Sequence, residues 1–379
     1  MKRYIFLIIG LSFFSCMEEP TTIYNYTPCG STKLVNSHLK SESLQVLLEE
    51  TALANLPGVS LVVENSTKGS FYGTAGKADL HNKVEMDVCK RFRVASLTKV
   101  FIATAIMMLV EQERLSLDTP IELILSENVL KDIKRANEAK VMNLLNHTSG
   151  IANYDDNQHF PAMILNEPGK RISLSEKLDL IRGQDATPAW VVEKFGSIYS
   201  NSNYLLLQII LEKITNATYE NFIRENILNP LDLESTSFST ENPYPENLAL
   251  GYIDFYDQGN LRDVSEWDAQ RFDGEGSMLA TSKDIAVFFK ALLKGELLKE
   301  STVVQMKEQG LGLLKENLND QLFIGHDGLA IGYSAEMWYS EESNDLVVLL
   351  ANQGRISDEQ PSIQPFEILL VDIIKLLQE

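Results

Sequence analysis

Strand-like and helix-like segments are segregated along this chain, and their order constrains the fold more than any other feature. Apolar segments with strand character occur near both ends, at residues 59–64, 69–74, 322–324, 333–339 and 346–351. The stretch between them, about residues 115–282, has mostly helical patterning. Because strands and helices do not alternate, a doubly wound parallel sheet is excluded. The order predicts an α+β fold: a mainly antiparallel sheet built from N- and C-terminal segments, flanked by helices at 44–55 and 363–377, with a large all-helical insertion.

The composition supports a folded chain and excludes one class of partner. Of the 379 residues, 44% are hydrophobic, which is enough to form a core and argues against global disorder. The 53 acidic residues outnumber the 33 Lys and Arg residues, so the formal net charge is −20. Binding to nucleic acid requires clustered positive charge, so we expect no nucleic-acid partner.

The first residues have the pattern of an export signal. A basic start at Lys2 and Arg3 precedes an apolar run that is too short to span a bilayer. The pattern resembles a bacterial lipoprotein signal in which Cys16 becomes lipidated, although Phe13 stands where leucine is usual. An ordinary signal peptide cleaved nearby is the alternative. The boundaries that follow are a signal peptide at 1–15, a lipidated tether at 16–40 and one folded domain at 41–379.

This signal predicts a location in the bacterial cell envelope, periplasmic or surface-facing. The lipid anchor at Cys16 would be the only contact with a membrane. If Cys16 is lipidated, Cys29 and Cys89 are left, and an exported protein could join them in a disulfide. Because Cys29 lies in the predicted tether, a buried free thiol at Cys89 is the favoured interpretation. Without a C-x-x-C or an H-E-x-x-H motif, we predict no metal and no cofactor.

A candidate nucleophile and base stand one helical turn apart in Ser96-Leu97-Thr98-Lys99. The following residues, 100–110, are apolar on every face, so the helix that starts here is expected to be buried. Ser96 could simply cap this helix. A lysine in the first turn is unfavourable, however, because burial and the helix dipole both oppose its charge. With a lowered pKa, Lys99 could accept a proton from Ser96, which shares its helix face.

Two further segments have both a structural and a functional interpretation. Tyr199-Ser200-Asn201 precedes an apolar helix, and its polar residues are typical of a helix cap. Functionally, Tyr199 could transfer a proton and Asn201 could bind a substrate amide. Gly325-His326-Asp327-Gly328 has the Asp-Gly signal of a hairpin turn. Alternatively, it is a strand edge that glycine keeps bare for a substrate backbone, with His326 projecting into a cleft.

In this order the motifs S-x-x-K, Y-x-N and H-x-G resemble those of the serine β-lactamase and penicillin-binding-protein superfamily, in particular its class C β-lactamase and D-alanyl-D-alanine carboxypeptidase branch. The resemblance covers about residues 42–379. It implies a sheet domain and a helical domain with the substrate site between them. It also implies that Ser96 forms an acyl-enzyme while Lys99 and Tyr199 move its proton. The remaining roles that it implies are an oxyanion hole at the backbone N–H groups of Ser96 and Leu329, and substrate contacts from Asn201, His326 and Gly328.

Asp327 departs from the family pattern. Many relatives have Lys-Thr-Gly where this chain has His326-Asp327-Gly328, and that lysine and threonine would bind the carboxylate of a β-lactam or of a peptide C-terminus. If Asp327 faces the substrate, its charge repels a carboxylate, which disfavours β-lactams and D-Ala-D-Ala peptides. Because successive strand residues face opposite sides, Asp327 can also point away.

The resulting prediction is an exported serine hydrolase that acts through a Ser96 acyl-enzyme on an amide or ester. The expected substrate is a small molecule or peptide: a peptidoglycan-type peptide, a β-lactam or a small ester. The alternative is a non-catalytic lipoprotein of the same fold that binds cell-wall material or peptides, although a binding protein needs no matched nucleophile and base. An α/β-hydrolase is disfavoured because the chain contains no G-x-S-x-G motif.

Overall fold

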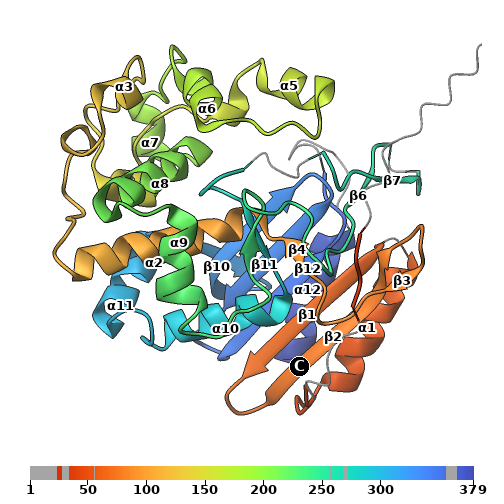
Figure 1. The fold of residues 1–379 in the computed structure, drawn as a ribbon. Coiled ribbons are helices and arrows are strands. Elements are labelled where there is room, and N and C mark those ends of the chain that lie inside the picture. The colour runs from red at the N-terminus through yellow and green to blue at the C-terminus, as the bar shows by residue number, and fades with distance from the viewer. Residues whose placement is uncertain (1–23, 28–33, 55, 257, 268–271, 356–364) are drawn as a thin grey trace, which may run out of the picture.

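The computed structural model describes residues 24–27, 34–54, 56–256, 258–267, 272–355 and 365–379. Its centre is a seven-stranded antiparallel sheet with the order β3-β2-β1-β12-β11-β10-β9. These strands are β1 (Gly58–Asn65), β2 (Gly69–Asp79), β3 (Val84–Glu85), β9 (Leu314–Leu318), β10 (Gln321–Ala330), β11 (Tyr333–Tyr339) and β12 (Asp345–Ala351). β1 pairs with β12, and Figure 1 shows the N-terminal and C-terminal strands side by side. The prediction of a sheet built from both ends of the chain is therefore confirmed.

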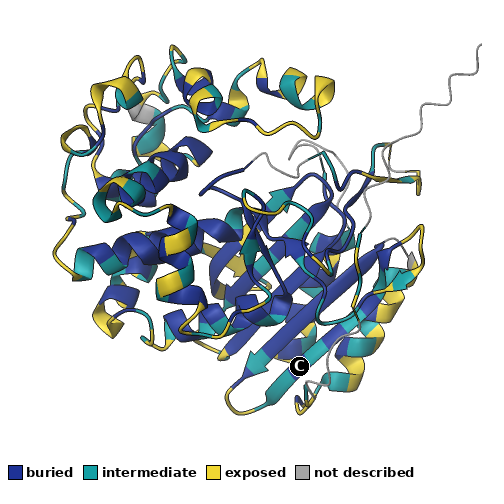
Figure 2. Ribbon diagram, in the orientation of Figure 1, coloured by how far each residue is buried: buried dark blue, intermediate teal, exposed yellow. Residues whose placement is uncertain are grey.

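Helices cover both faces of this sheet, and the strand sequences explain why. β1 and β12 are buried along nearly their whole length, because apolar residues point to both faces. One face packs against the terminal helices α1 (Ser41–Ala54) and α12 (Pro365–Gln378). The other face packs against α2 (Thr98–Glu111) and α10 (Ser282–Leu293). Figure 2 shows the buried strands between helices whose outer sides are exposed.

Between α2 and α10 the chain leaves the sheet and forms a mainly helical region, which lies above the sheet in Figure 1. Its helices are α3 (Glu127–Leu130), α4 (Val141–Leu145), α5 (Phe160–Asn166), α6 (Leu174–Ile181), α7 (Ala189–Phe195), α8 (Asn201–Thr215) and α9 (Tyr219–Ile223). The remaining elements are β4 (Phe92–Arg93), β5 (Ser237–Phe238), β6 (Tyr252–Asp254), β7 (Leu261–Asp263), β8 (Met278–Ala280) and α11 (Glu300–Gln309). The helical insertion is confirmed, but its last part contains short strands. Strands of two or three residues are too short to show an alternating pattern in the sequence.

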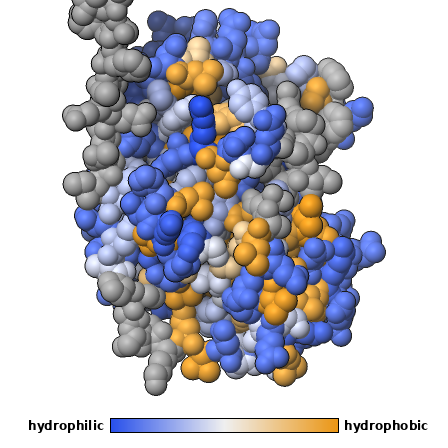
Figure 3. Space-filling model, turned by 90° about the vertical axis from the view of Figure 1, so that its right-hand side faces the viewer, coloured by the Kyte–Doolittle hydropathy of each residue, from blue (hydrophilic) through white to orange (hydrophobic). Residues whose placement is uncertain are grey.

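The described residues that precede α1 lie against the domain. The backbone N–H of Thr27 donates to Asn247 Oδ1 at 2.9 Å, and that of Tyr72 donates to Asn36 Oδ1 at 2.8 Å. The predicted signal peptide and Cys16 lie outside the described residues. Within the described ranges, every helix is too short or too polar to span a bilayer. On the face drawn in Figure 3, hydrophobic residues gather in small groups among hydrophilic ones.

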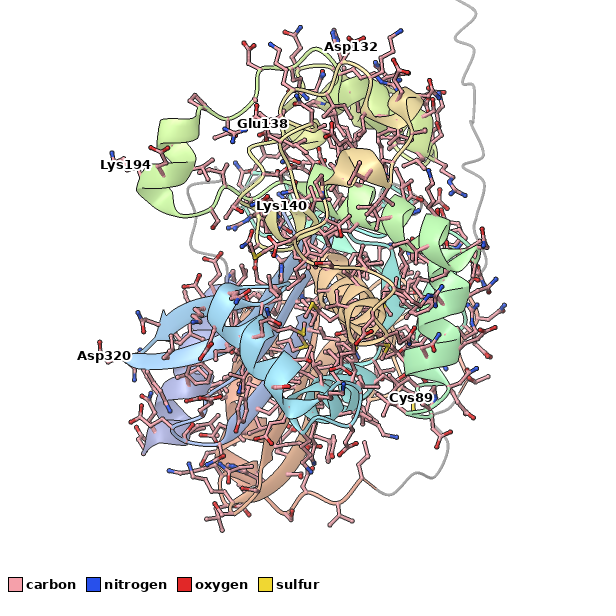
Figure 4. All side chains as sticks on the ribbon, turned by 90° about the vertical axis from the view of Figure 1, so that its left-hand side faces the viewer. Cys89, Asp132, Glu138, Lys140, Lys194 and Asp320 are labelled. Carbon is pink, nitrogen blue, oxygen red and sulfur yellow. The ribbon has the colours of Figure 1, made fainter. Side chains whose placement is uncertain are left out.

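Cys89 lies in a turn after β3 and is half-buried and disulfide-bonded. The prediction of a buried free thiol is therefore wrong: Cys89 is only partly buried, and its sulfur is bonded in a disulfide. Figure 4 shows Cys89 on the sheet side of the molecule, away from Lys194 of the helical region. The other two cysteines, Cys16 and Cys29, lie outside the described residues.

Candidate active site

Ser96 lies at a sharp turn between the sheet and helix α2. It belongs to the 3-10 turn Ala95–Leu97, which directly precedes α2. Ala95 has a φ of 46°, which is uncommon for a residue with a side chain and recurs at functional sites. The N-cap residue of α2 is Leu97, and no side chain caps the helix. The interpretation of Ser96 as a simple helix cap is therefore wrong.

Lys99 contacts Ser96 from within the core. Its Nζ lies 2.9 Å from Ser96 Oγ and donates to the backbone carbonyl oxygen of Glu275 at 2.6 Å. The side chain is fully buried. Burial lowers the pKa of Lys99 to about 7, although nearby acidic groups, chiefly Glu275, oppose the shift. Near neutral pH a large fraction of this amine is therefore unprotonated and able to accept a proton.

Tyr199 supplies a second contact to the same oxygen. Its hydroxyl donates to Ser96 Oγ at 2.8 Å, and Lys99 Nζ lies 5.1 Å from the centre of its ring. Although Tyr199 is 40% exposed overall, desolvation by the groups packed around it raises its pKa, so the phenol stays protonated at neutral pH. The structure thus brings Ser96, Lys99 and Tyr199 together, as the sequence motifs predict.

His147 packs behind Tyr199 and fixes the start of α8. The two rings lie 4.4 Å apart between centroids. His147 Nδ1 accepts hydrogen bonds from the backbone N–H of Ser200 at 3.2 Å and from Asn203 Nδ2 at 3.1 Å. Burial lowers the pKa of His147 well below its ordinary value, so the ring is neutral. These contacts describe a residue that positions Tyr199.

Asn201 stands at the first position of α8 and faces a carboxylate. Its Nδ2 donates to Asp155 Oδ2 at 2.6 Å, and its buried Oδ1 has no hydrogen-bond partner among the described residues. The N-cap residue Ser200 makes no side-chain capping bond. Helix capping therefore does not explain the polar residues here, and the contact of Asn201 with a substrate amide stays a prediction.

Strand β10 passes directly beside Ser96. The Gly325–Gly328 segment lies within this strand, so its interpretation as a hairpin turn is wrong. The first residue of β9, Leu314, pairs with Gly325. Residues 326–330 of β10 extend beyond this pair and have no partner on that edge among the described strands. A Cβ atom on Gly328 would lie 2.5 Å from the carbonyl oxygen of Val94 and 3.3 Å from the backbone nitrogen of Ser96. Glycine therefore allows β10 to approach the nucleophile closely, and Leu329 follows it on the same strand.

His326 is buried, and its ring lies near Tyr199. Its ring lies 6.2 Å from that of Tyr199 between centroids. Its Nδ1 donates to the backbone carbonyl oxygen of Asp327 at 2.6 Å, which leaves Nε2 as an acceptor. Burial lowers the pKa of His326, so the ring is neutral at neutral pH.

Asp327 leaves β10 on the opposite face from His326. It stands opposite Glu336, whereas His326 stands opposite the buried Met337. The side chain of Asp327 is 56% exposed, yet its Oδ1 lies only 3.6 Å from His326 Nδ1. The carboxylate therefore stays close to His326, and its charge influences the pKa of both Lys99 and Tyr199.

A buried charged network, which the motifs did not reveal, supports Lys99 from behind. Lys177 Nζ donates to Glu275 Oε1 at 2.6 Å and to Asp273 Oδ2 at 2.9 Å. The hydroxyl of Tyr154 also donates to Glu275 Oε1, at 2.8 Å. Although burial opposes both charges, their mutual attraction raises the pKa of Lys177 and lowers that of Glu275. No sequence signal connects Glu275 to Lys177, because they are 98 residues apart and share no motif.

The described residues contain no group of His, Cys, Asp and Glu side chains arranged to hold a metal ion.

Residues 47–364 match the family model described as Beta-lactamase. The chain belongs to the beta-lactamase family. Protein flp of Staphylococcus aureus (strain N315) is 25% identical to this protein, and the match covers 85% of the present chain. The chain spans only 64% of the length of flp. Penicillin-binding protein 4* of Bacillus subtilis (strain 168) is 22% identical over 86% of the chain and 74% of its own length.

Solved structures of the beta-lactamase family confirm the fold. D-amino acid amidase from Ochrobactrum anthropi SV3, complexed with L-phenylalanine amide, superposes with a TM-score of 0.77 at 26% identity, covering 89% of this chain and 98% of the amidase. The penicillin binding protein from Bacillus halodurans gives a TM-score of 0.72 at 21% identity, covering 88% and 98%. Both agree with the predicted α+β fold.

Proposed function

We propose that this beta-lactamase-family protein is a serine hydrolase that forms an acyl-enzyme at Ser96 from an amide or ester. One observation carries the proposal: Ser96 Oγ lies between Lys99 Nζ at 2.9 Å and the Tyr199 hydroxyl at 2.8 Å. A nucleophile with an adjacent base is what acyl transfer requires. A protein that only bound its ligand would gain nothing from a buried lysine held against a serine.

The groups present support a specific sequence of proton transfers. Neutral Lys99 removes the Ser96 proton while Oγ attacks the carbonyl carbon, and the backbone N–H groups of Ser96 and Leu329 stabilise the oxyanion. When the bond to the leaving group breaks, Tyr199 donates its proton to the leaving nitrogen or oxygen and regains one from Lys99. Water then attacks the acyl-enzyme ester and releases the acid, returning the proton to Ser96.

An amide of an amino acid is one candidate substrate. The solved amidase of similar fold is a D-amino acid amidase and was obtained with L-phenylalanine amide. Carboxylate-bearing substrates such as β-lactams receive less support for two reasons. The buried His326 is neutral. Asp327 lies on the opposite face of β10, but its negative charge still acts on Lys99 and Tyr199 and would oppose a second negative charge beside them. We therefore rank amides and esters without a carboxylate beside the scissile bond above β-lactams and D-Ala-D-Ala peptides.

The test of this proposal is detection of the covalent intermediate. The protein is incubated separately with a penicillin, a D-Ala-D-Ala peptide, D- and L-phenylalanine amide, and short-chain esters. The intact mass of the protein is recorded at short times. We expect an acyl adduct on Ser96 from at least one amide or ester, and none in Ser96→Ala. Substrate turnover by a folded Ser96→Ala variant would overturn the proposal. Ligand binding without any adduct or turnover would favour the alternative of a non-catalytic binding protein.

We also propose that the protein is exported and anchored through a lipid on Cys16. The basic start and the short apolar run before Cys16 support this proposal. In a bacterial host, the full chain should fractionate with membranes, and Cys16→Ser should appear in the soluble fraction. A soluble parent protein with an N-terminus other than Cys16 would instead indicate an ordinary signal peptide.

A further inference from the structure

Asp327 is an exposed negative charge that directly precedes Gly328 on the strand packed against the Ser96 turn. The strand segment that carries it lies against the Ser96 turn, because Gly328 packs on the backbone nitrogen of Ser96. The carboxylate is solvent-accessible and lies close to His326. In the described part of the chain, no lysine or arginine forms an ion pair with Asp327.

The groups around Asp327 leave its charge uncompensated. His326 is buried with a lowered pKa, so it carries no charge at neutral pH. Glu336, opposite Asp327 on β11, has a pKa raised by burial and by Asp327 itself, so it adds no second charge there. A further carboxylate, Asp155, acts on Lys99 and Tyr199 from the helical side. Two carboxylates, Asp327 and Asp155, therefore act electrostatically on the groups that contact Ser96.

We propose that Asp327 is a specificity-determining residue that favours substrates with a cationic group, such as a primary ammonium, beside residues 326–328. This inference rests on the proposed function and names the substrate class of the same site. Charge complementarity favours a cation where a carboxylate would be repelled. A lysine and threonine at these positions would bind the C-terminal carboxylate of a peptide, which belongs to the leaving group. Because this chain has a negative Asp327 instead of that lysine and threonine, we expect the preferred leaving group to be positively charged.

The test uses three esters with the same acyl group. Their alcohol chains have equal length and end in an ammonium, a methyl or a carboxylate group. For the parent protein we expect kcat/KM to be about fivefold higher with the ammonium ester than with the methyl ester, as for one partly exposed charge pair. This ratio should fall as ionic strength rises, because salt screens exposed charges.

Variants distinguish the effect of the Asp327 charge on substrate preference from the effect of the protein's net charge. Asp327→Asn should abolish the preference for the ammonium ester, and Asp327→Lys should shift it toward the carboxylate ester. Asp320→Asn is the matched control: this exposed aspartate lies in the turn between β9 and β10, at the edge of the sheet in Figure 4. It removes the same charge and should keep the parent ratio.

The possible failures are distinguishable. If the parent forms no Ser96 adduct with these three esters or with any amide or ester of the adduct experiment, the proposed function fails. If it hydrolyses the methyl ester but shows no preference for the ammonium ester, the inference about Asp327 is overturned while the proposed function stands. An equal loss of preference in Asp320→Asn would also overturn it, because the effect would then come from net charge.

Discussion

Lys177 Nζ lies 2.6 Å from Glu275 Oε1, and both side chains are fully buried. This ion pair joins α6 of the helical region to the segment before β8. The backbone carbonyl oxygen of that same Glu275 accepts the hydrogen bond from Lys99 at 2.6 Å. The pair therefore connects the helical region to the contact that holds the proposed base against Ser96.

Breaking the buried pair should destabilise the protein strongly. Lys177→Met keeps the length of the side chain but leaves Glu275 and Asp273 without their cation, and we expect a loss of about 3–5 kcal/mol in the free energy of unfolding. The measurement is urea denaturation at neutral pH. The matched control is Lys170→Met, which removes the exposed ion pair with Glu167 and should leave the stability nearly unchanged, because solvent screens an exposed pair. Equal losses in both variants would contradict the structural role assigned to Lys177.

The rate of acylation should depend on the protonation of Lys99. Because burial lowers the pKa of Lys99 to about 7, the amine is protonated below that pH and unable to accept the Ser96 proton. We therefore expect the acylation rate, measured as the single-turnover burst, to rise with pH and level off above about 7. Lys99→Arg should lose acylation at every pH, since a guanidinium stays protonated. An acylation rate independent of pH across neutrality would show that another group is the base.

Removing the Tyr199 hydroxyl should slow turnover without unfolding the protein. The hydroxyl donates to Ser96 Oγ at 2.8 Å, and a positioned proton-transfer group contributes about 10²- to 10⁴-fold. Tyr199→Phe is thus expected to lower kcat by this factor. Tyr339→Phe removes a hydroxyl that bonds Asn344 at the surface and should retain parent activity. A Tyr199→Phe variant with parent kcat would remove Tyr199 from the mechanism.

Local sequence patterns predicted those features of the fold and site that depend on residues close together in the chain. The continuous apolar runs at β1 and β12 indicate strands buried on both faces, and the structure places them side by side at the centre of the sheet. Ser96 and Lys99 are three residues apart, so helical geometry alone brings their side chains together. Tyr199 is distant in sequence, and only the ordered set of motifs connected it to them.

Long-range contacts decide what the sequence did not reveal. Asp327-Gly328 has a strong local turn signal, but pairing with β11 holds it in a continuous strand. Lys177 and Glu275 belong to different parts of the fold, and neither lies in a sequence pattern that predicts an ion pair. Their pairing follows from how α6 packs against the segment before β8, which is a property of the folded chain.

Gly328 should be necessary for the oxyanion hole. A Cβ at this position would lie 2.5 Å from the carbonyl oxygen of Val94, a backbone atom that cannot move independently, so β10 must shift away from Ser96. Gly328→Ala is expected to lower kcat by about 10²- to 10³-fold, the loss typical of removing one oxyanion donor. Gly169→Ala is the control, because its Cβ would find its nearest neighbour at 3.5 Å. Parent kcat in Gly328→Ala, measured with the best ester of the adduct experiment, would show that β10 does not bind the oxyanion.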